Sequence, residues 1–452
     1  ESLRPVPELS FAVRELGCTA GIMITASHNP KDYNGYKVYG SDGCQVTSQT
    51  ADDIKEYVDK EGLFGIRGLH FEDALAQGKI RWIRHEVIDL FMEHVSHVRT
   101  NRRSLKRLTV VYTPLNGAGW KLVPRALENA GVCDLYSVAN QDYPDGNFAT
   151  CPKPNPEVRE ALVEGLQVCK EYDADILIAT DPDCDRVGIA VRDGDEFVLM
   201  TGNEVGAMLC EYLLSNLKEQ NKLPQNPVVV KSIVTTPLIE AICSSYGAKV
   251  ADLLTGFKYI GELITNLEKE GKEDDFVVGM EESYGYLRGI HARDKDAVVA
   301  SLMIAEMAAV YKLKGISLKQ FMDSIYEKYG MYLNTVMNFA FEGASGMQKM
   351  SDIMNSLREN APESFAGKKV VKAADYKTSR MVDIVTGEES VINLPKSNVL
   401  SYSLEDNSKV IVRPSGTEPK IKVYISAYGM TRKESEDKTA VMSEDATKLL
   451  GV

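Results

Sequence analysis

The sequence predicts an α/β fold built from several domains. Its 452 residues exceed the roughly 100–200 residues of a single domain, and 44% of them are hydrophobic. Short apolar segments bounded by glycine, proline or polar residues alternate with helical stretches, which is typical of mixed or mainly parallel sheets covered by helices. The predicted strands are Gly21–Thr25, Thr109–Tyr112, Asp175–Ala179, Val228–Val230 and Phe276–Gly279.

A faint internal repeat favours three related α/β units. Helix-like runs span Pro7–Gly17, Pro114–Gly131 and Pro237–Gly247, and a strand-like stretch follows each of them. Proline favours the start of a helix and glycine its end, so each run has suitable boundaries. The alternative interpretation is chance spacing of common boundary residues.

The final part of the chain predicts a smaller α+β domain. A helical stretch, Ser345–Asn360, precedes two strand-like segments, Ser408–Val412 and Ile421–Ser426, which flank a tight Gly/Pro loop. The expected arrangement is therefore three related α/β domains with mixed sheets plus this C-terminal domain, around a central cleft. The predicted domains are residues 1–100, 101–224, 225–337 and 338–452.

Composition and charge exclude several classes of protein. The formal net charge of −13 disfavours nucleic acid as a partner, and any phosphate site must be locally basic. No apolar run reaches the ~18 residues of a membrane span. The segment Val298–Val310 carries Glu306 and predicts a buried helix. No signal peptide is visible, and because Glu1 stands where an initiator methionine is expected, we expect the chain to lack its beginning.

The eight cysteines are scattered and never form a CxxC pair. This pattern favours reduced cysteines in the cytosol over a disulfide framework or a zinc site. A disulfide-bonded secreted protein is the alternative.

The first candidate motif is Thr25-Ala26-Ser27-His28-Asn29-Pro30, which follows an apolar strand. In open α/β sheets, functional groups gather at the carboxyl ends of strands. A serine beside a histidine at such a place is a possible nucleophile. A simple Ser/Asn-Pro turn is the alternative, and this segment alone favours the turn.

The second motif, Asp181-Pro182-Asp183-Cys184-Asp185-Arg186, also follows a strand. Three carboxylates at alternate positions of an extended segment point the same way and repel one another. A hard divalent cation relieves this repulsion, so we predict a metal site rather than a solvated acidic turn. Arg186 adds a fixed pair of donors for a phosphate. The segment Val187–Val191, an Arg-Asp-Gly-Asp turn and Glu196–Met200 then predict a hairpin.

Two further loops carry polar groups. Gly279-Met280-Glu281-Glu282-Ser283-Tyr284-Gly285 places a carboxylate and a hydroxyl two residues apart, which suits neighbouring sugar hydroxyls, although surface loops often look alike. Arg413-Pro414-Ser415-Gly416-Thr417-Glu418-Pro419-Lys420 offers an arginine, hydroxyls and a glycine, which together suit a phosphate. A hairpin loop is the alternative for the second segment. Solvated lysines are the default interpretation of Asn34-Gly35-Tyr36-Lys37 and Arg293-Asp294-Lys295-Asp296.

Together the four loops TASHNP, DPDCDR, GMEESYG and RPSGTEP resemble the α-D-phosphohexomutase superfamily, in the same order and over nearly the whole chain. The details are most similar to the bacterial phosphoglucomutase-like branch that also resembles animal phosphopentomutase and glucose-1,6-bisphosphate synthase enzymes. The segments Asp145–Phe148, Pro154–Glu157 and Thr255–Lys258 belong to that pattern.

The resemblance implies a phosphoglucomutase that interconverts glucose 1-phosphate and glucose 6-phosphate through a phosphoserine and a glucose 1,6-bisphosphate intermediate. The implied cofactors are Mg²⁺ and glucose 1,6-bisphosphate as activator. Phosphomannomutase and phosphopentomutase activities remain alternatives, as do a phosphatase-like hydrolase and a non-enzymatic sugar-phosphate-binding protein. The implied partner is a sugar phosphate, with no nucleic acid and no membrane, and the expected state is a cytoplasmic monomer or weak homodimer.

The resemblance also implies residue roles. Ser27 would carry the phosphoryl group, with His28, Lys37 and Arg186 beside it. The metal ligands would be Ser27, Asp181, Asp183 and Asp185. The sugar would be bound by Thr255, Gly256, Lys258, Glu281 and Ser283, and the phosphate that is not transferred by Arg413, Ser415, Gly416 and Thr417.

Two departures from the family pattern concern the site. An early loop with an arginine near the active site is expected to precede this sequence. A related branch has a histidine where this chain has Gly285. We therefore expect Lys37 or Lys295 to act as the general base, with a pKa lowered by the nearby metal and arginine.

Overall fold

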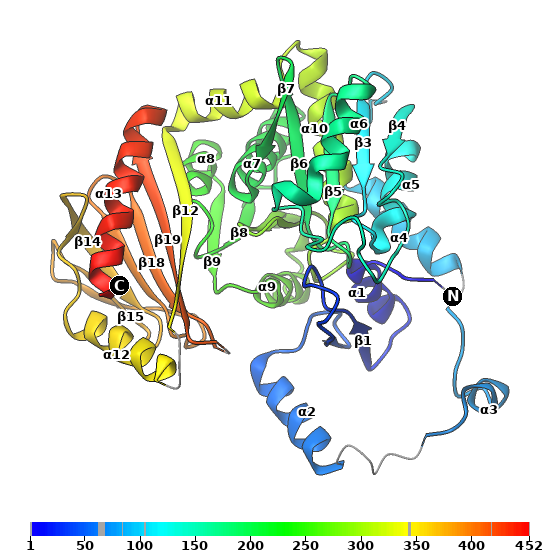
Figure 1. The fold of residues 1–452 in the computed structure, drawn as a ribbon, viewed down its shortest axis with the longest axis horizontal. Helices are drawn as coiled ribbons and strands as arrows, with labels where there is room; N and C mark the ends of the chain where they lie inside the picture. The colour runs from blue at the N-terminus through cyan, green and yellow to red at the C-terminus, as the bar shows by residue number, and fades with distance from the viewer. Residues whose placement is uncertain are drawn as a thin grey trace. The chain divides into compact units, whose positions relative to one another are not determined.

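The computed structural model describes residues 2–61, 68–83, 85–103, 105–341, 345–416 and 418–451, and at Ser48 it describes the backbone alone. The chain forms two compact units. Unit 1 contains Glu1–Val230 and Gly256–Lys319, and unit 2 contains Lys231–Thr255 and Gln320–Val452. Figure 1 shows the elements of both units coloured along the chain.

Unit 1 contains a five-stranded mixed sheet in the order β4-β3-β5-β6-β7. β3 pairs in parallel with β4 and β5, whereas β5–β6 and β6–β7 are antiparallel, which confirms the predicted hairpin. Every residue of β5 is buried, as expected for a strand covered on both faces. The bounds are β3 (Thr109–Thr113), β4 (Asp134–Ser137), β5 (Ile176–Thr180), β6 (Val187–Asp193) and β7 (Glu196–Met200).

Unit 1 also contains two other pairs of strands. β1 (Ala20–Ile24) and β2 (Tyr36–Gly40) form an antiparallel pair. β10 (Phe276–Glu281) pairs with β11 (Gly285–Leu287) in the same way, and β8 (Val228–Ser232), in which unit 1 ends, lies on the other side of β10. All five predicted strands are therefore present, with ends that move by one or two residues.

The helices of unit 1 have recognisable boundary signals. In α7, Thr201 and Glu204 form a reciprocal capping box at the first turn. In α10, the Asp296 carboxylate accepts bonds from the amides of Val298 and Val299. The helices are α1 (Val6–Glu15), α2 (Ser48–Glu61), α3 (Phe71–Ala76), α4 (His85–His97), α5 (Leu122–Asn129), α6 (Val163–Glu171), α7 (Gly202–Glu219), α9 (Phe257–Lys269) and α10 (Ala297–Leu313).

The prediction of a helix from Pro114 is wrong at its start. α5 begins at Leu122, after a short 3-10 turn at Ala118–Trp120. The backbone cannot be helical earlier, because Leu115 and Asn116 have φ values of 47° and 60°, in the left-handed region. The other two members of the repeat, α1 and α8, begin within one residue of their prolines.

Unit 2 contains a long sheet in the order β12-β19-β18-β17-β14-β15-β16, all of whose neighbouring strands are antiparallel. α12 and α13 pack on one face of this sheet, because residues of both helices share a core with alternate residues of β18 and β19. The bounds are β12 (Met331–Ala340), β13 (Ser364–Phe365), β14 (Lys368–Asp375), β15 (Arg380–Asp383), β16 (Glu389–Val391), β17 (Leu400–Leu404), β18 (Lys409–Pro414), β19 (Lys420–Gly429), α12 (Gly346–Glu359) and α13 (Arg432–Leu450).

The predicted α+β domain is thus confirmed. Unit 2 also contains α8 (Leu238–Tyr246) and β9 (Lys249–Leu253), and α11 (Leu318–Tyr329) begins in unit 1 and continues into unit 2. None of the eight cysteines, all of which lie in the described residues, is in a disulfide bond. Within the described ranges, no helix has both the length and the apolar character needed to cross a membrane.

A buried carboxylate organises the interior of unit 1. Glu306 of α10 is fully buried, and Arg99 Nε lies 2.9 Å from it as an ion pair. The Glu306 carboxylate also accepts bonds from the Tyr212 hydroxyl at 2.9 Å, from the Thr100 hydroxyl at 2.9 Å and from the amides of Thr100 and Asn101 at 3.1 Å. The donors come from α7 and from the segment that follows α4. Glu306 therefore connects both of them to α10.

Replacing Glu306 with glutamine should destabilise unit 1 strongly. The change leaves the Arg99 guanidinium without its carboxylate and places an amide nitrogen against donors, which costs about 3–5 kcal/mol for a broken buried pair. We expect a large fall in the melting temperature measured by calorimetry. The control is Glu219→Gln, an exposed carboxylate on α7. Equal melting temperatures for the two variants would contradict this role of Glu306.

Candidate active site

The segment that carries Ser27 connects β1 to β2. The Ser27 amide donates to the Thr25 hydroxyl at 2.8 Å, and Ser27 itself has a φ of 54°. A non-glycine residue in the left-handed region is uncommon and requires local support, which the Thr25 hydroxyl provides. Lys37, on the neighbouring strand, pairs with Met23 in the register of this hairpin. The two strands thus bring a serine and a lysine to one end of a hairpin.

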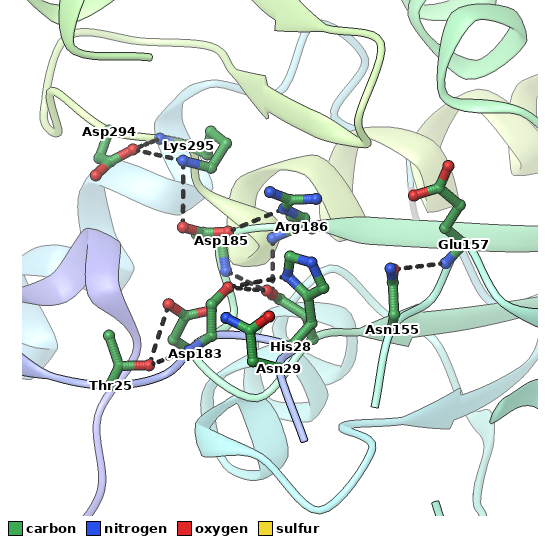
Figure 2. A network of polar contacts seen from close by, with 12 residues as sticks. Thr25, His28, Asn29, Asn155, Glu157, Asp183, Asp185, Arg186, Asp294 and Lys295 are labelled. Atoms are coloured by element: carbon green, nitrogen blue, oxygen red, sulfur yellow. Dashed lines mark hydrogen bonds and ion pairs between the residues drawn. The ribbon is translucent and has the colours of Figure 1, made fainter. Parts of the chain in front are cut away.

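The three aspartates of the second motif form one buried cluster between β5 and β6. Asp181, Asp183 and Asp185 are 0%, 4% and 1% exposed. One ligand oxygen from each lies within 4.8 Å of the others. Asp181 Oδ1 accepts the amides of Asp185 at 3.0 Å and Arg186 at 2.9 Å, which fixes the turn between the two strands. Figure 2 shows part of this network.

Ser27 lies directly against this cluster. Its hydroxyl is 3.3 Å from Asp181 Oδ2, 3.3 Å from Asp183 Oδ1 and 3.1 Å from His28 Nδ1. The Thr25 hydroxyl donates to Asp183 Oδ2 at 3.3 Å. The structure therefore brings together two motifs that lie more than 150 residues apart in the sequence.

Two lysines face the same carboxylates. Lys37 Nζ donates to Asp183 and to Asp185 at 2.9 Å each. Lys295 Nζ lies 3.2 Å from Asp185 and 3.0 Å from Asp294, whose other oxygen accepts the Tyr39 hydroxyl at 2.7 Å. Because both lysines share Asp185, the cluster holds its negative charge against two fixed positive charges, of which Figure 2 shows Lys295.

This arrangement shifts the proton affinities of the cluster in opposite directions. Burial and the neighbouring carboxylate of Asp183 raise the pKa of Asp181 well above its usual value. Burial acts in the same sense on Asp185, but Lys295 and Lys37 outweigh it and lower the pKa of that carboxyl. Burial and the charge of Arg186 lower the pKa of His28 to about 4, so His28 is neutral near pH 7.

The carboxylates of the cluster raise the pKa of both lysines, whereas the lowering that a bound metal would cause stays a prediction. Burial alone would lower the pKa of Lys37, but Asp185 and Asp183 raise it well above its usual value. Burial alone would also lower the pKa of Lys295, but Asp185 and Asp294 raise it. The sequence indicates positive charges near each lysine, but it does not show which carboxylates each lysine contacts.

The donor set fits a divalent cation. Asp185 Oδ1 is buried and has no hydrogen-bond partner among the described residues, although a buried carboxylate oxygen normally has one. Arg186 Nε is also buried without a hydrogen-bond partner, 3.8 Å from that oxygen. Three carboxylates with a free oxygen and a nearby hydroxyl provide the hard oxygen ligands that Mg²⁺ and similar ions prefer.

The third motif ends β10 beside this cluster. Glu281 is buried, and its Oε1 accepts the amide of Gly256 at 2.7 Å, so Oε2 is the oxygen left for another group. Burial raises the pKa of Glu281, opposed by Lys295. Ser283 follows in the partly exposed turn between β10 and β11, and Lys258 Nζ lies over the Tyr259 ring at 5.2 Å. Thr255 is the last residue of its segment of unit 2.

Gly285 provides space for Lys295. A Cβ on Gly285 would lie 2.2 Å from Lys295 Cδ and 2.7 Å from Cγ. The aliphatic part of Lys295 therefore crosses the backbone of β11 on its way to Asp185. A side chain at position 285 and the observed position of Lys295 exclude each other.

The fourth motif lies in unit 2, in the turn between β18 and β19. Ser415 donates its amide to the Lys420 carbonyl at 2.7 Å, and Arg413 is opposite Lys422 in the register. A Cβ on Gly416 would contact no protein atom, so packing does not require this glycine. Thr417 lies outside the described residues.

Some residues of the site were not identified from the sequence. Thr25 donates to Asp183, while Asp294 accepts bonds from Lys295 and Tyr39. Asp294 lies in the segment Arg293-Asp294-Lys295-Asp296, and the alternation of opposite charges in that segment is the sequence signal that could have identified it. Arg293 of that segment is structural, because it is fully buried and pairs with Glu268 at 2.6 Å.

Comparison with known proteins identifies the family. The sequence matches four domain families described as phosphoglucomutase/phosphomannomutase: α/β/α domain I over residues 1–63, domain II over 89–194, domain III over 201–329 and the C-terminal domain over 355–438. The chain belongs to the phosphoglucomutase/phosphomannomutase family. The resemblance to the phosphohexomutase superfamily is thereby confirmed.

Individual relatives support this family assignment. A phosphoglucomutase of Staphylococcus saprophyticus is 36% identical over 430 residues, 94% of this chain and 76% of the relative. One of Staphylococcus epidermidis is 37% identical over 432 residues, 94% of this chain and 77% of the relative. Among solved structures, a putative phosphomannomutase of Thermus thermophilus has a TM-score of 0.70 at 21% identity, covering 100% of this chain and 83% of that one.

A second solved structure shows the same fold. The open form of parafusin, a phosphoglucomutase from Paramecium, has a TM-score of 0.68 at 20% identity and covers 99% of this chain and 81% of that one. At this identity the likeness concerns the fold, and the family assignment depends on the sequence matches above.

Metal affinity should fall as the pH is lowered. Because the pKa of Asp181 is raised, a proton occupies that carboxyl at mildly acidic pH and competes with the cation. We expect weaker Mn²⁺ binding, measured by electron paramagnetic resonance, at about pH 5 than near neutral pH. Asp193→Asn, at the exposed end of β6, is the control and should bind Mn²⁺ as the wild type does. Affinity that does not change with pH would contradict the prediction.

Proposed function

We propose that this chain is a phosphoglucomutase that interconverts glucose 1-phosphate and glucose 6-phosphate through a phosphoserine at Ser27. The observation that carries the proposal is the position of the Ser27 hydroxyl, 3.3 Å from both Asp181 and Asp183. A serine has no need of such neighbours in an ordinary turn, whereas a serine that carries a phosphoryl group needs adjacent charge stabilisation.

Asp181, Asp183, Asp185 and Ser27 are the residues that would hold Mg²⁺, and the free Asp185 Oδ1 supports this assignment. A bound Mg²⁺ supplies Lewis-acid stabilisation of charge on the transferred phosphoryl group. Arg186 and Lys37 add fixed positive charge beside Asp185. The protein therefore surrounds the phosphoryl group with cations before the reaction begins.

The transfer step breaks the bond between phosphorus and Ser27 Oγ and forms a bond between phosphorus and a sugar hydroxyl oxygen. The proton of that hydroxyl passes to a base, for which we propose Lys37 or Lys295. Asp183 and Asp185, which would hold the cation, are also the carboxylates that raise the pKa of Lys37, so a bound cation would weaken both of these contacts. Lys295 would be affected less, because one of its two carboxylate contacts is with Asp294. Proton acceptance by either lysine is thus coupled to metal occupancy, and the neutral His28 is left to orient Ser27.

The remaining predicted residues are assigned to binding. The free Oε2 of Glu281, together with Ser283, suits the sugar hydroxyls, while Thr255, Gly256 and Lys258 are proposed to select the sugar. The open space at Gly416 supports close approach of a phosphate to the backbone there. The proposed ligands of the phosphate that is not transferred are Arg413, Ser415, Gly416 and Thr417.

Further details of the proposal follow from the family. Glucose 1,6-bisphosphate would serve as activator and intermediate, turning end for end between the two transfers. We propose that the protein acts in the cytoplasm as a monomer or weak homodimer, with the domains divided at residues 100, 224 and 337. Rates with mannose 1-phosphate and ribose 1-phosphate would identify a phosphomannomutase or a phosphopentomutase.

Replacing Ser27 with alanine should abolish mutase activity while leaving the fold intact. The change removes the atom that carries the phosphoryl group, and the small side chain fits the same loop. Conversion of glucose 1-phosphate, with Mg²⁺ and a trace of glucose 1,6-bisphosphate, can be followed by coupling to a dehydrogenase. Ser356→Ala, on the exposed face of α12, should retain full activity. Activity that survives in Ser27→Ala would rule out the phosphoserine mechanism.

Gly285→Ala should lower turnover while metal binding persists. The added Cβ displaces the Lys295 side chain, and a misplacement of about 1 Å near reacting groups reduces rates by roughly 100-fold. We expect kcat to fall and Mn²⁺ affinity to stay close to that of the wild type. Gly68→Ala, where a Cβ meets no atom, is the control. Equal kcat values for the two variants would show that the position of Lys295 is unimportant.

A further inference from the structure

Unit 1 contains a cavity lined by residues to which the mutase proposal assigns no role. It has a volume of about 800 Å³, within the range of about 300–1,000 Å³ that small-molecule sites occupy. Its walls are the segment that follows α4 and the C-terminal ends of α7 and α10 (Figure 1 shows these helices). The walls also include Arg288, which follows β11.

The lining of this cavity is strongly basic. The chain as a whole carries a formal net charge of −13, so a local excess of positive charge is not expected from composition. Glu219 is the one carboxylate among the described lining residues. The arginines and lysines of the lining are Arg99, Arg102, Arg103, Lys222, Arg288 and Lys314.

Three of these cations are accounted for by the fold. Arg99 pairs with the buried Glu306 at 2.9 Å. Lys222 and Lys314 follow the C-terminal ends of α7 and α10, where a positive charge complements the helix dipole. These residues offset negative charge that the protein itself supplies, so they do not by themselves indicate a ligand.

Arg288 is not accounted for in this way. Its Nε donates to the Val98 carbonyl at 3.0 Å and its Nη1 to the Val277 carbonyl at 2.7 Å, so the guanidinium is held in place by the backbone. Among the described residues no carboxylate lies within ion-pair distance of it. Burial lowers the pKa of Arg288 to about 10, and the charge of Glu306, which pairs with Arg99, offsets this only in part.

Arg102 and Arg103 add to this uncompensated charge. In the described part of the chain, neither side chain forms an ion pair, and both are exposed beside the cavity. The backbone that carries them is nevertheless held, because Arg99 Nη2 donates to the carbonyls of Asn101 and Arg103 at 3.0 and 2.7 Å. A fixed, partly buried arginine and two arginines on an anchored segment thus face one cavity.

We propose that this cavity binds a small organic anion that carries two phosphoryl groups, such as a sugar bisphosphate or a nucleoside diphosphate. Guanidinium groups bind phosphoryl oxygens through paired, charge-assisted hydrogen bonds. A single phosphate would leave most of the cavity empty, whereas an organic bisphosphate fills it and meets charges on more than one wall. The ligand would add negative charge beside Arg288, whose nearest charged group, Glu306, already pairs with Arg99.

The test uses inorganic pyrophosphate as probe, titrated into the full chain by calorimetry without divalent cations. The pocket variant is the double charge reversal Arg103→Glu/Lys222→Glu. Its matched control is Arg107→Glu/Lys218→Glu, which changes the net charge equally at exposed residues that do not line the cavity. Arg413→Ala serves to remove binding at the proposed substrate-phosphate loop, so that the two sites are distinguished.

We expect pyrophosphate to bind Arg413→Ala and the matched control, and to bind the pocket variant at least about tenfold more weakly at this site. Equal affinity of the pocket variant and its control would overturn the proposal, as would loss of all binding in Arg413→Ala. Because the titration needs neither turnover nor metal, failure of the mutase proposal would leave its result unaffected.

The Arg413→Ala variant is also used to distinguish a nucleoside diphosphate from a sugar bisphosphate as the ligand. ADP and glucose 1,6-bisphosphate are titrated in turn, and the one that binds more tightly than pyrophosphate identifies the organic part that the cavity accepts. If neither binds, the cavity is not a site for organic bisphosphates. Arg288→Met is a further variant, and if it folds it should weaken binding of the preferred ligand.

Discussion

The mutual repulsion of Asp181, Asp183 and Asp185 is the constraint around which the site is arranged. Three nearly unexposed carboxylates within 4.8 Å of one another cannot all carry charge without nearby cations. The protein supplies Lys37 and Lys295, and both of them contact Asp185. The charge that remains, together with the free oxygen of Asp185, is what a divalent cation would neutralise.

The geometry of the cluster depends on backbone features outside it. Asp181 and Asp185 lie at the two ends of a turn that the Asp181 carboxylate closes by accepting two amides. Gly117 allows this turn to lie close, because a Cβ there would be 2.3 Å from the Cα of Pro182. The cluster is therefore held by strand ends and a tight backbone contact, which keeps the positions of its oxygens constant.

Much of the fold and of the acidic cluster could be predicted from the sequence. Strands bounded by glycine and proline were identified because their apolar runs are short and uninterrupted, and the acidic motif was identified because no core tolerates three adjacent unpaired carboxylates. Ser27 itself was not, since its segment alone favours a turn. Its role followed from the family resemblance, and its contact with Asp181 is a long-range feature that local pattern does not contain.

Other features depend on contacts between distant segments. The bond from the Gly256 amide to Glu281 and the direction of the lysine pKa shifts require knowledge of which groups meet. The start of α5 was misplaced because left-handed φ values at Leu115 and Asn116 leave no clear signal in residue type. The basic cavity was also missed, since its arginines and lysines come from four separate segments of an acidic chain.

The most direct test of the account is to follow the phosphoryl group itself. The protein is incubated with glucose 1,6-bisphosphate and Mg²⁺, digested, and its peptides are mapped by mass spectrometry. The account predicts one phosphoryl group on the peptide that contains Ser27, which is lost from that peptide when glucose 6-phosphate is added in excess. A phosphoryl group on another residue, or none on any peptide of an active preparation, would contradict it.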